Sequence, residues 1–356
     1  MTLPHMTRAY APLTSDIEAM NEFGALQKVS IPAERALTVY VDKRELVTLM
    51  TLGANPELLV LGYLRNQRLV RSVADIESVT VDWDVGAAAV KTRHGIEDIE
   101  EKTAHRVVTT GCGQGSVFGG LMDEVDQIAL SADASLTQSQ LYGLVNTIRL
   151  KETTYKSAGS VHACALFSTA SGEADMLLFV EDVGRHNAID TIAGWMWMNM
   201  APTLPTAYGS LPPEGAAAPA ARQSRFRGPD SVAESMPPPH SEALQSAGPA
   251  SALRSLPAGE GGVEGSPALD PDKFVFYTTG RLTSEMVIKS AQMGVPVVVS
   301  RSGITQMGHQ VAQSVGLCAI GRATNKRFLC YTHFGRLKLE PGLVTPTVLS
   351  SEKETG

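Results

Sequence analysis

Residues 201–272 constrain the fold more than any other part of the sequence. This segment holds 13 of the chain's 20 prolines, with 8 glycines, 14 alanines and 9 serines among its 72 positions. A composition of this kind, without a repeat, cannot bury enough apolar surface to offset the entropy lost on ordering. We therefore predict a disordered and dispensable insertion, with polyproline character at residues 237–239, between two folded parts of the chain.

The remainder has the composition of a folded protein. Of the 356 residues, 43% are hydrophobic and 19% are charged, which excludes wholesale disorder and allows one large or two ordinary domains. The four cysteines contain no CxxC spacing and are too few for a disulfide scaffold. Residues 1–16 contain no apolar core of the signal-peptide type, and no apolar run is long enough to cross a bilayer. We expect a cytoplasmic protein with reduced thiols and no membrane contact.

Charge is distributed unevenly along the chain. The formal net charge is −7, which argues against general nucleic-acid binding. Residues 1–200 carry 16 Lys and Arg against 25 Asp and Glu, whereas residues 273–356 carry 10 against 4 and contain no Asp. A basic region on an acidic protein indicates a local anionic ligand, and the alternative is a chance scatter of surface lysines and arginines.

Apolar patterns and capping residues predict alternating strands and helices. Asn55 with Pro56 marks the start of one helix, and Thr137 caps another, whose apolar residues recur with helical spacing. We expect a layered α/β fold. The predicted strands are 37–41, 45–49, 76–82, 87–92, 163–168, 176–181, 274–277, 295–300, 317–320 and 328–331, and further helices are expected from about 187 and at 284–293 and 305–315.

Cys112 lies in the glycine-rich sequence TTGCGQG at residues 109–115. Glycines on both sides favour a mobile loop with an accessible thiol, which a thiolate nucleophile or a sulfur carrier requires. The other three cysteines lie within apolar strands, as structural cysteines usually do. The alternative for Cys112 is an exposed cysteine without a role.

Polar residues also gather where predicted strands end. Residues 180–187 read VEDVGRHN, in which Arg185 can bind a phosphate or carboxylate and His186 can exchange protons near neutral pH. Such strand ends are ligand sites in α/β folds, although a structural salt-bridge corner would have the same composition. Three further strand ends carry similar residues and together suggest a phosphate-bearing ligand. They contain Arg281 with Ser284 and Glu285, Arg301 with Ser302, and the basic turn Gly321, Arg322, Ala323, Thr324, Asn325, Lys326 and Arg327.

His162 does not belong to a zinc-hydrolase motif. Zinc deaminases have a Glu two residues after the ligand and a later PCxxC, whereas Cys164 stands in that position here and no PCxxC or HExxH occurs. We therefore expect no metal ligated by the protein, and we interpret His162 as a hydrogen-bonded core or supporting residue.

These motifs together resemble the formate dehydrogenase accessory sulfurtransferase family, FdhD. The resemblance covers about residues 33–200 and 273–335, and its most specific part is EDVGRHNA at 181–188. The other matching segments are ERALTVYV at 34–41, ELVTLM at 45–50, TGCG at 110–113, GR at 280–281, SEM at 284–286 and SRS at 300–302.

The resemblance implies a cytidine-deaminase-like α/β domain without zinc, a smaller N-terminal β-containing part, and a homodimer. It implies that Cys112 accepts persulfide sulfur from a cysteine desulfurase and passes it to the molybdenum or tungsten bis-guanine-dinucleotide cofactor. That cofactor is then inserted into the catalytic subunit of formate dehydrogenase. The family's cofactor-contacting turn corresponds to residues 322–327, and we expect further cofactor contacts from Arg185, His186, Arg281, Ser284, Arg301 and Ser302.

Two departures from the family pattern bear on this expectation. The family commonly has a second cysteine in the loop where Gly115 stands here, so a single-cysteine relay is expected. An aromatic and an Arg are usual where Arg322 and Thr324 stand. The predicted organisation is a flexible N-terminus at 1–32, a β-containing part with the cysteine loop at 33–136, the α/β domain at 137–200 and 273–340, the insertion at 201–272 and a flexible tail at 341–356.

A second function hypothesis is a binding module that shelters or delivers the cofactor without carrying sulfur. The missing second cysteine favours it, while the retained Cys112 favours transferase activity. A third hypothesis, a nucleotide-acting hydrolase, lacks its metal ligands.

Overall fold

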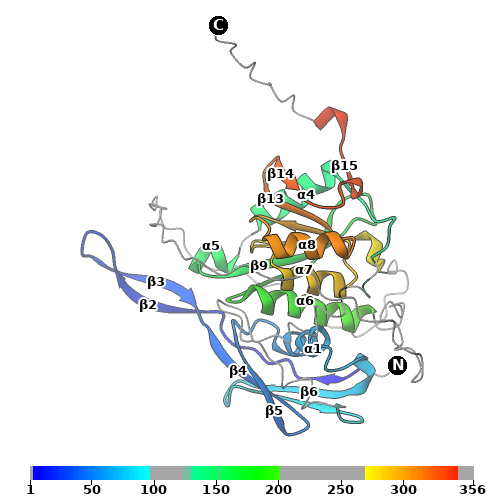
Figure 1. The fold of residues 1–356 in the computed structure, drawn as a ribbon. Helices are drawn as coiled ribbons and strands as arrows, with labels where there is room; N and C mark the ends of the chain where they lie inside the picture. Colours follow the sequence, from blue (N-terminus) through cyan, green and yellow to red (C-terminus); the bar gives the residue numbers. More distant parts are fainter. Residues whose placement is uncertain are drawn as a thin grey trace, which may run out of the picture. The chain divides into compact units, whose positions relative to one another are not determined.

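The computed structural model describes residues 3–96, 125, 128, 130–151, 153–200 and 269–343. The described residues belong to one compact unit (Figure 1), and the second unit, residues 210–268, lies outside the described residues. Among the described helices, none is long and apolar enough to cross a membrane.

The N-terminal part is a five-stranded sheet. Its strands are β1 (His5–Met6), β4 (Arg35–Val41), β5 (Arg44–Thr51), β6 (Ile76–Asp82) and β7 (Ala87–Thr92), in the order β1-β6-β7-β4-β5. The turn between β4 and β5 has positive φ at both Asp42 and Lys43, as a two-residue type I′ turn requires. Leu37, Val39 and Val41 alternate along β4, so all three face the same buried side of the sheet.

Helix α1 (Pro56–Asn66) covers the buried side of this sheet. It begins after Asn55 with Pro56 in its first turn, where the missing N–H of proline costs nothing. Its residues Leu59 and Leu64 belong to one apolar core with the inward-facing residues of β4 and its neighbouring strands.

The second sheet has six strands, in the order β10-β9-β11-β12-β13-β14. β11, β12 and β13 are parallel, while β9 is antiparallel to both β10 and β11, and β14 is antiparallel to β13. The bounds are β9 (His162–Ser168), β10 (Asp175–Asp182), β11 (Phe274–Thr278), β12 (Val297–Ser300), β13 (Cys318–Thr324) and β14 (Arg327–Cys330).

Helices cover both faces of this sheet. On one face α6 (Arg185–Met200), α7 (Ser284–Gln292) and α8 (Gln306–Ser314) form an apolar core with the strands (Figure 1). On the other face, α4 (Gln138–Leu150) packs Leu141 and Leu144 against a second core. Thr137 caps α4 as predicted, because its side chain accepts the N–H of Gln140 while the Gln140 side chain accepts the N–H of Thr137.

Two glycines allow α1, which packs on the first sheet, and α6, which packs on the second, to lie close together. A Cβ on Gly194 of α6 would lie 2.0 Å from the carbonyl oxygen of Leu58, and a Cβ on Gly62 of α1 would lie 1.6 Å from that of Asp190. The backbones of α1 and α6 therefore approach one another more closely than any side chain at these positions would allow.

The predicted fold class, a layered α/β domain with a smaller N-terminal β-containing part, is confirmed, and each predicted strand and each predicted helix is present. Small shifts occur at the ends, where strand β13 extends to Thr324 and helix α7 ends at Gln292. The elements that were not predicted are β1, β2 (Thr14–Met20), β3 (Leu26–Pro32), β8 (Leu136–Thr137), β15 (Leu337–Lys338), α5 (Thr154–Ala158) and the 3₁₀ helices at Val73–Asp75, Pro271–Lys273, Phe334–Arg336 and Pro341–Leu343.

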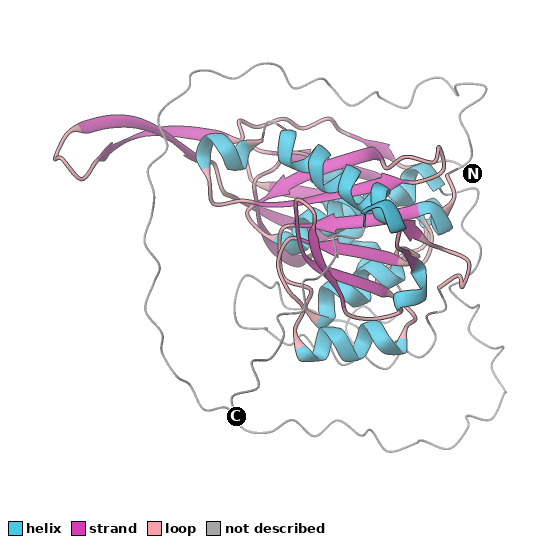
Figure 2. Cartoon of the chain, turned by 90° about the horizontal axis from the view of Figure 1, so that it is seen from above, coloured by secondary structure: helices cyan, strands magenta, loops and turns pink. Residues whose placement is uncertain are grey.

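Four segments differ from their predicted conformation. Residues 269–272, predicted as the end of the disordered insertion, lead into the 3₁₀ helix Pro271–Lys273, which the Asp270 side chain caps by accepting the N–H of Asp272. Residues 341–343, predicted as the start of a flexible tail, form a 3₁₀ helix. Residues 1–32, predicted as a flexible N-terminus, contain β1 and the antiparallel β2–β3 hairpin, which extends away from both larger sheets (Figure 2). Residues 321–327, predicted as a turn, lie mostly within β13 and β14, and only Asn325 and Lys326 link the two strands. Pairing between these strands satisfies the backbone hydrogen bonds that a free turn would leave open.

Candidate functional site

Four strands bring their carboxyl ends to one edge of the six-stranded sheet. β10, β11, β12 and β13 run in the same direction, while β9 runs against them and begins at that edge. Arg185 follows β10, Arg281 follows β11, Arg301 follows β12, and Arg322 lies near the end of β13. Ligands bind at such strand ends in α/β sheets. The fold therefore gathers four arginines that are far apart in the sequence, and we call this the arginine edge.

Hydrogen bonds hold the loops of the arginine edge together. The Ser302 hydroxyl donates to the carbonyl of Thr279 at 2.9 Å, and the Arg322 N–H donates to the carbonyl of Ser302 at 2.7 Å. The Ser300 hydroxyl donates to the carbonyl of Gly280 at 2.7 Å. The hydroxyl of Ser302, predicted as a ligand contact, thus already fixes one loop against the next.

The four arginines differ in exposure. Arg281, Arg301 and Arg322 are exposed, so their guanidinium groups can reach a ligand in solution. Arg185 is only 8% exposed and lies close to Gly280, where an added Cβ would stand 2.9 Å from the Arg185 Cδ. Position 280 therefore needs glycine in order to let the Arg185 side chain pass.

His162 begins β9 at this same edge, opposite Asp182 of β10. Burial lowers the pKa of the His162 imidazole, and the nearby charges of Arg185, His186 and Arg281 lower it further. A neutral imidazole among cations can accept or donate a hydrogen bond without adding positive charge. Within the described part of the chain, no group of three or more His, Cys, Asp or Glu is arranged as a metal site.

Glu181 and Asp182, at the start of the EDVGRHNA motif, organise the backbone around the edge. The Glu181 carboxylate accepts the N–H groups of Thr154 and Tyr155, at 2.6 and 3.1 Å, and so holds the first turn of α5. The Asp182 carboxylate accepts the hydroxyl of Thr51 at 2.5 Å and the N–H of Leu52 at 3.1 Å, which ties the end of β5 to the second sheet.

Asn187 completes this connection between the two sheets. Its Nδ2 donates to Asp182 at 2.7 Å and to the carbonyl of Met50 at 2.6 Å. Burial raises the pKa of Asp182, while hydrogen bonds from Gly184, Thr51 and Asn187 favour its charged form. These contacts are structural, so part of the motif supports the site instead of touching a ligand.

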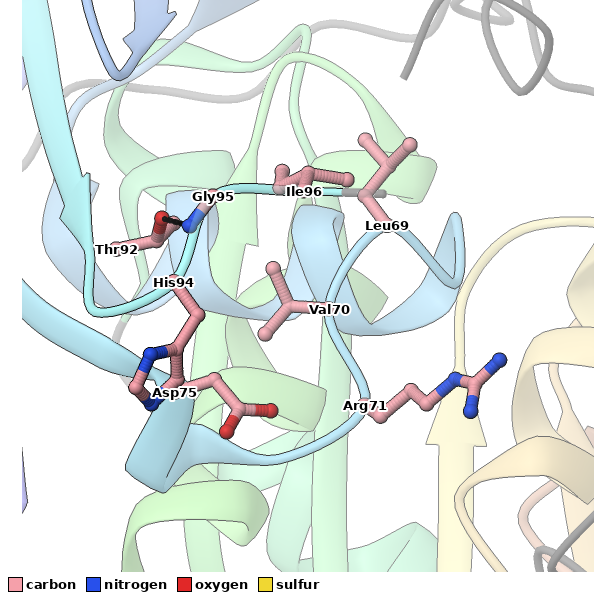
Figure 3. Close-up of a pocket in the computed structure, with 8 residues that line it drawn as sticks. All are labelled: Leu69, Val70, Arg71, Asp75, Thr92, His94, Gly95 and Ile96. Carbon is pink, nitrogen blue, oxygen red and sulfur yellow. Dashed lines mark hydrogen bonds between the residues drawn. The ribbon is translucent and has the colours of Figure 1, made fainter. Parts of the chain in front are cut away.

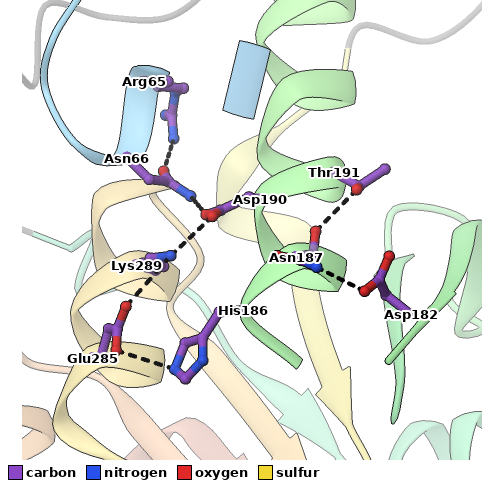
Figure 4. Close-up of polar contacts among 9 residues, drawn as sticks. All are labelled: Arg65, Asn66, Asp182, His186, Asn187, Asp190, Thr191, Glu285 and Lys289. Carbon is purple, nitrogen blue, oxygen red and sulfur yellow. Dashed lines mark hydrogen bonds and ion pairs between the residues drawn. The ribbon is translucent and has the colours of Figure 1, made fainter. Parts of the chain in front are cut away.

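A buried chain of polar side chains runs from His186 into the protein (Figure 4). His186 Nε2 lies 3.1 Å from Glu285 Oε2, and Lys289 Nζ lies 3.5 Å from Glu285 Oε1 and 2.9 Å from Asp190 Oδ2. Asn66 donates to the other oxygen of Asp190 at 2.7 Å. The chain joins α1, α6 and α7 and fixes the imidazole of His186 at the base of the arginine edge.

Burial and neighbouring charges together set the pKa values in this chain. Burial disfavours the charged form of Lys289, but the carboxylates of Asp190 and Glu285 outweigh that effect and raise its pKa. Burial raises the pKa of Asp190 despite the charge of Lys289 and the hydrogen bond from Asn66. For Glu285, the charge of Lys289 and the contact with His186 outweigh burial and lower the pKa to about 2.

The basic segment at residues 321–327 comprises the end of β13, the link formed by Asn325 and Lys326, and the start of β14. Arg322, Thr324, Asn325, Lys326 and Arg327 are exposed. Ala323 is buried and packs in the core on the α4 side, so its side chain is not available to a ligand. The carbonyl of Lys326 accepts the hydroxyl of Tyr142 from α4 at 3.2 Å, which anchors the turn.

Of the two remaining predicted residues, the structure describes Ser284 but not Cys112. Ser284 is the first residue of α7, half-buried, two residues after the bridge that joins Leu282 to Ile304. Cys112, the predicted sulfur-carrying residue, lies outside the described residues, as do residues 201–268 of the predicted insertion.

Some supporting residues were missed by sequence reasoning. Lys289 and Asn66 had no recognisable signal, because their partner Asp190 is 99 and 124 residues away in sequence. His162 was interpreted as a core or supporting residue, and its place beside two arginines follows only from the pairing of β9 with β10 and β11.

The structure also has a cavity away from the arginine edge, between the end of α1 and the end of β7 (Figure 3). Its volume is about 250 Å³. None of the predicted site residues that the structure describes lines it. The lining residues are Leu69, Val70, Arg71, Asp75, Thr92, His94, Gly95 and Ile96.

The chain is similar to proteins of one known family. The model of the FdhD/NarQ family matches residues 32–206 and 264–338. A Bacillus subtilis protein named sulfur carrier protein FdhD is 26% identical over 326 residues, covering 89% of this chain and 94% of its own. A Wolinella succinogenes protein of the same name is 22% identical, with 86% and 82% covered.

One solved structure has the same fold. It is described as a putative formate dehydrogenase accessory protein from Desulfotalea psychrophila, with a TM-score of 0.57 and 17% identity, covering 92% of this chain and 100% of that one. The family match extends over β4 to β7 of the first sheet, the whole six-stranded sheet and the arginine edge, and omits residues 207–263. This chain belongs to the FdhD/NarQ family.

Proposed function

We propose that this protein is a sulfur carrier that serves the maturation of a formate dehydrogenase. In this proposal Cys112 accepts sulfur from a cysteine desulfurase and passes it to the molybdenum or tungsten bis-guanine-dinucleotide cofactor, which is its substrate. Family membership supports the sulfur-carrier role, since relatives are named sulfur carrier protein FdhD and the structural neighbour is named a putative formate dehydrogenase accessory protein. We further expect a homodimer that acts in the cytoplasm.

Loading is a simple exchange at sulfur. The Cys112 thiolate attacks the outer sulfur of the donor's persulfide and displaces the donor cysteine as a thiolate. Cys112 then carries the persulfide, and the donor thiolate takes up a proton. The reaction needs one accessible thiol, so the glycine at position 115, where relatives commonly have a second cysteine, does not prevent it.

The observation that carries the substrate assignment is the arginine edge. Arg281, Arg301 and Arg322 present exposed guanidinium groups from loops that hydrogen bonds join. Guanidinium groups bind phosphate oxygens through paired, charge-assisted hydrogen bonds, and a bis-guanine-dinucleotide cofactor carries several phosphates. His186 and the buried chain behind it hold the base of this surface in position.

The arginine edge can be tested with guanosine diphosphate as the probe. We expect Arg281→Ala to weaken binding roughly tenfold at low salt, because one charge-assisted contact to a phosphate is lost, and to have a smaller effect at high salt. Calorimetric titration at two salt concentrations measures both values.

The matched control is Arg149→Ala, which removes an exposed arginine from α4 on the face opposite α6. We expect this variant to bind as the parent does. Unchanged affinity of Arg281→Ala at low salt, or an equal loss in both variants, would reject the arginine edge as the phosphate site.

A further inference from the structure

We propose that Cys318 and Cys330 form a redox-active thiol pair that closes reversibly to a disulfide between β13 and β14. Their sulfur atoms lie 3.7 Å apart. The pair does not include Cys112, and the inference does not depend on the proposed sulfur transfer. Its substrates are small-molecule disulfides, which oxidise the pair, and thiols, which restore it.

Strand register brings the two thiols to the same side of the sheet. Ile320 of β13 pairs directly with Cys330 of β14, and Cys318 stands two residues before Ile320. Side chains two residues apart on a strand point to the same face, so Cys318 and Cys330 are diagonal neighbours across the pair. A disulfide has sulfurs about 2.0 Å apart, so closure requires an approach of roughly 1.7 Å.

The end of β14 can accommodate that movement. Cys330 is the last residue of β14, and β14 is the last strand at its end of the sheet order. After it, the carbonyl of Thr332 lies 3.5 Å from the Cys330 sulfur. Among the described strands, β14 pairs only with β13, which leaves Cys330 more freedom to shift than a residue in a central strand has.

The two thiols differ as the attacking and resolving members of a pair do. Cys330 is partly exposed, whereas Cys318 is fully buried. Hydrogen bonding with Cys318 lowers the pKa of Cys330, and the same contact together with burial raises the pKa of Cys318. The accessible cysteine is thus the better thiolate, which is the nucleophile in exchange.

The exchange proceeds in two steps. The Cys330 thiolate attacks one sulfur of a small-molecule disulfide, forms a mixed disulfide and releases one thiolate. Cys318 loses its proton and attacks the Cys330 sulfur, which forms the Cys318–Cys330 bond and releases the second thiolate. The two released thiolates take up the two protons that the cysteines lost, and two electrons pass from the protein to the small molecule.

Cys164 provides an internal contrast. It is fully buried in β9, and its sulfur lies 3.4 Å from the Thr278 hydroxyl. Burial raises the pKa of the Cys164 thiol to about 12, so it is a poor nucleophile. We expect Cys164 to remain reduced when the pair is oxidised.

The test uses the full-length protein and oxidised glutathione. After incubation, free thiols are alkylated and the protein is digested with trypsin without reduction. Cleavage separates residues 302–322, which contain Cys318, from residues 328–336, which contain Cys330. We expect the two peptides to be joined, with a mass two hydrogen atoms below their sum, and to separate again on treatment with reduced glutathione.

Two variants test the order of the steps. In Cys318→Ala, we expect a stable glutathione adduct on the peptide 328–336, since no second thiol resolves it. In Cys330→Ser, we expect Cys318 to stay unmodified because it is buried. Cys164→Ala is the matched control and should form the joined peptide as the parent does.

The proposal would be overturned if, after treatment of the parent with oxidised glutathione, both peptides were alkylated and not joined. A joined peptide that contains Cys112 or Cys164 instead of this pair would also overturn it. The readout monitors neither cofactor nor desulfurase, so its failure is distinguishable from a failure of the proposed sulfur transfer.

Discussion

At the scale of single residues, Glu285 shows how the interior supports the arginine edge. Its carboxylate lies 3.1 Å from His186 Nε2 and 3.5 Å from Lys289 Nζ. The charge of Lys289 and the contact with His186 outweigh burial and lower the pKa of Glu285 from 4.5 to about 2. Because the folded protein stabilises the carboxylate, Glu285 adds stability that is fully present above pH 4.5 and is lost as the pH falls toward 2.

This linkage predicts how Glu285→Gln changes the pH dependence of stability. Between the two pKa values, the carboxyl of the unfolded chain binds a proton while the folded one does not, so the free energy of unfolding decreases as pH falls. The variant cannot be protonated at this position and lacks that decrease. The parent's advantage over Glu285→Gln should therefore shrink by about 3 kcal/mol from about pH 5 to about pH 2.

Urea denaturation at several pH values measures the two curves. Glu173→Gln removes an exposed carboxylate and serves as the control. A constant difference between the parent and Glu285→Gln over the whole range would contradict the role assigned to Glu285.

At the scale of secondary-structure elements, the contact between α1 and α6 joins the two halves of the molecule. Gly62 and Gly194 allow the two helix backbones to approach closely. That contact places Asn66 of α1 within 2.7 Å of Asp190 of α6, so the helix crossing also completes the buried polar chain.

The close contact between α1 and α6 predicts that Gly194→Ala strongly lowers the free energy of unfolding. Its Cβ would lie 2.0 Å from the carbonyl oxygen of Leu58, a backbone atom that cannot move without shifting α1. We expect a loss of about 3 kcal/mol in the free energy of unfolding, measured by urea denaturation.

Gly143→Ala is the matched control for this experiment. Gly143 also lies inside a helix, α4, but it is exposed and no atom lies within 4 Å of the added Cβ. We expect this variant to be stabilised by about 0.5–1 kcal/mol, because alanine has the higher helix propensity. A Gly194→Ala protein as stable as the parent would refute the close helix contact.

Elements with strong local signals were predictable from sequence, whereas those made by pairing alone were not. The helix start at Asn55 and Pro56, the cap at Thr137 and the apolar runs of β11 and β12 are visible in the chain itself, although the Asn55 side chain makes no capping hydrogen bond. The β2–β3 hairpin escaped prediction because Ile17, Met20 and Leu26 are exposed, so the apolar alternation of a half-buried strand is missing.

Part of the candidate site could also be predicted from the sequence, and part could not. Arg281 and Arg301 follow parallel strands, and the ends of parallel strands meet at one edge, so their proximity could be inferred from order alone. The ion pair of Lys289 with Asp190 could not be inferred, because it depends on the packing of α6 against α7.

At the scale of the whole molecule, the two matched parts of the family model are separated by residues 207–263. The described elements on either side of this gap, α6 and β11, belong to the same compact unit and the same core. This supports the prediction that the insertion is dispensable.

Replacement of residues 207–263 by a Gly/Ser linker should therefore leave the fold intact. We expect the midpoint of thermal unfolding to stay close to that of the parent, and the affinity for guanosine diphosphate to be unchanged. A strong loss of either property would show that the insertion contributes to the folded unit or to its ligand site.

The proposed function of the whole molecule is to carry sulfur on Cys112, and one measurement tests this function most directly. The full-length protein is incubated with a cysteine desulfurase and cysteine, and its mass is taken under non-reducing conditions before peptides are mapped. Cys112→Ala is treated in parallel, and activity of the desulfurase is verified on another acceptor.

We predict one added sulfur atom on the peptide that contains Cys112 in the parent, and none in Cys112→Ala. The peptide of residues 328–336, which contains the exchange-active Cys330, is mapped separately so that sulfur on it is not counted as loading of Cys112. Absence of added sulfur in the parent would contradict the account and favour a cofactor-binding module that carries no sulfur. Equal loading of Cys112→Ala would contradict the assignment of Cys112 as the carrier.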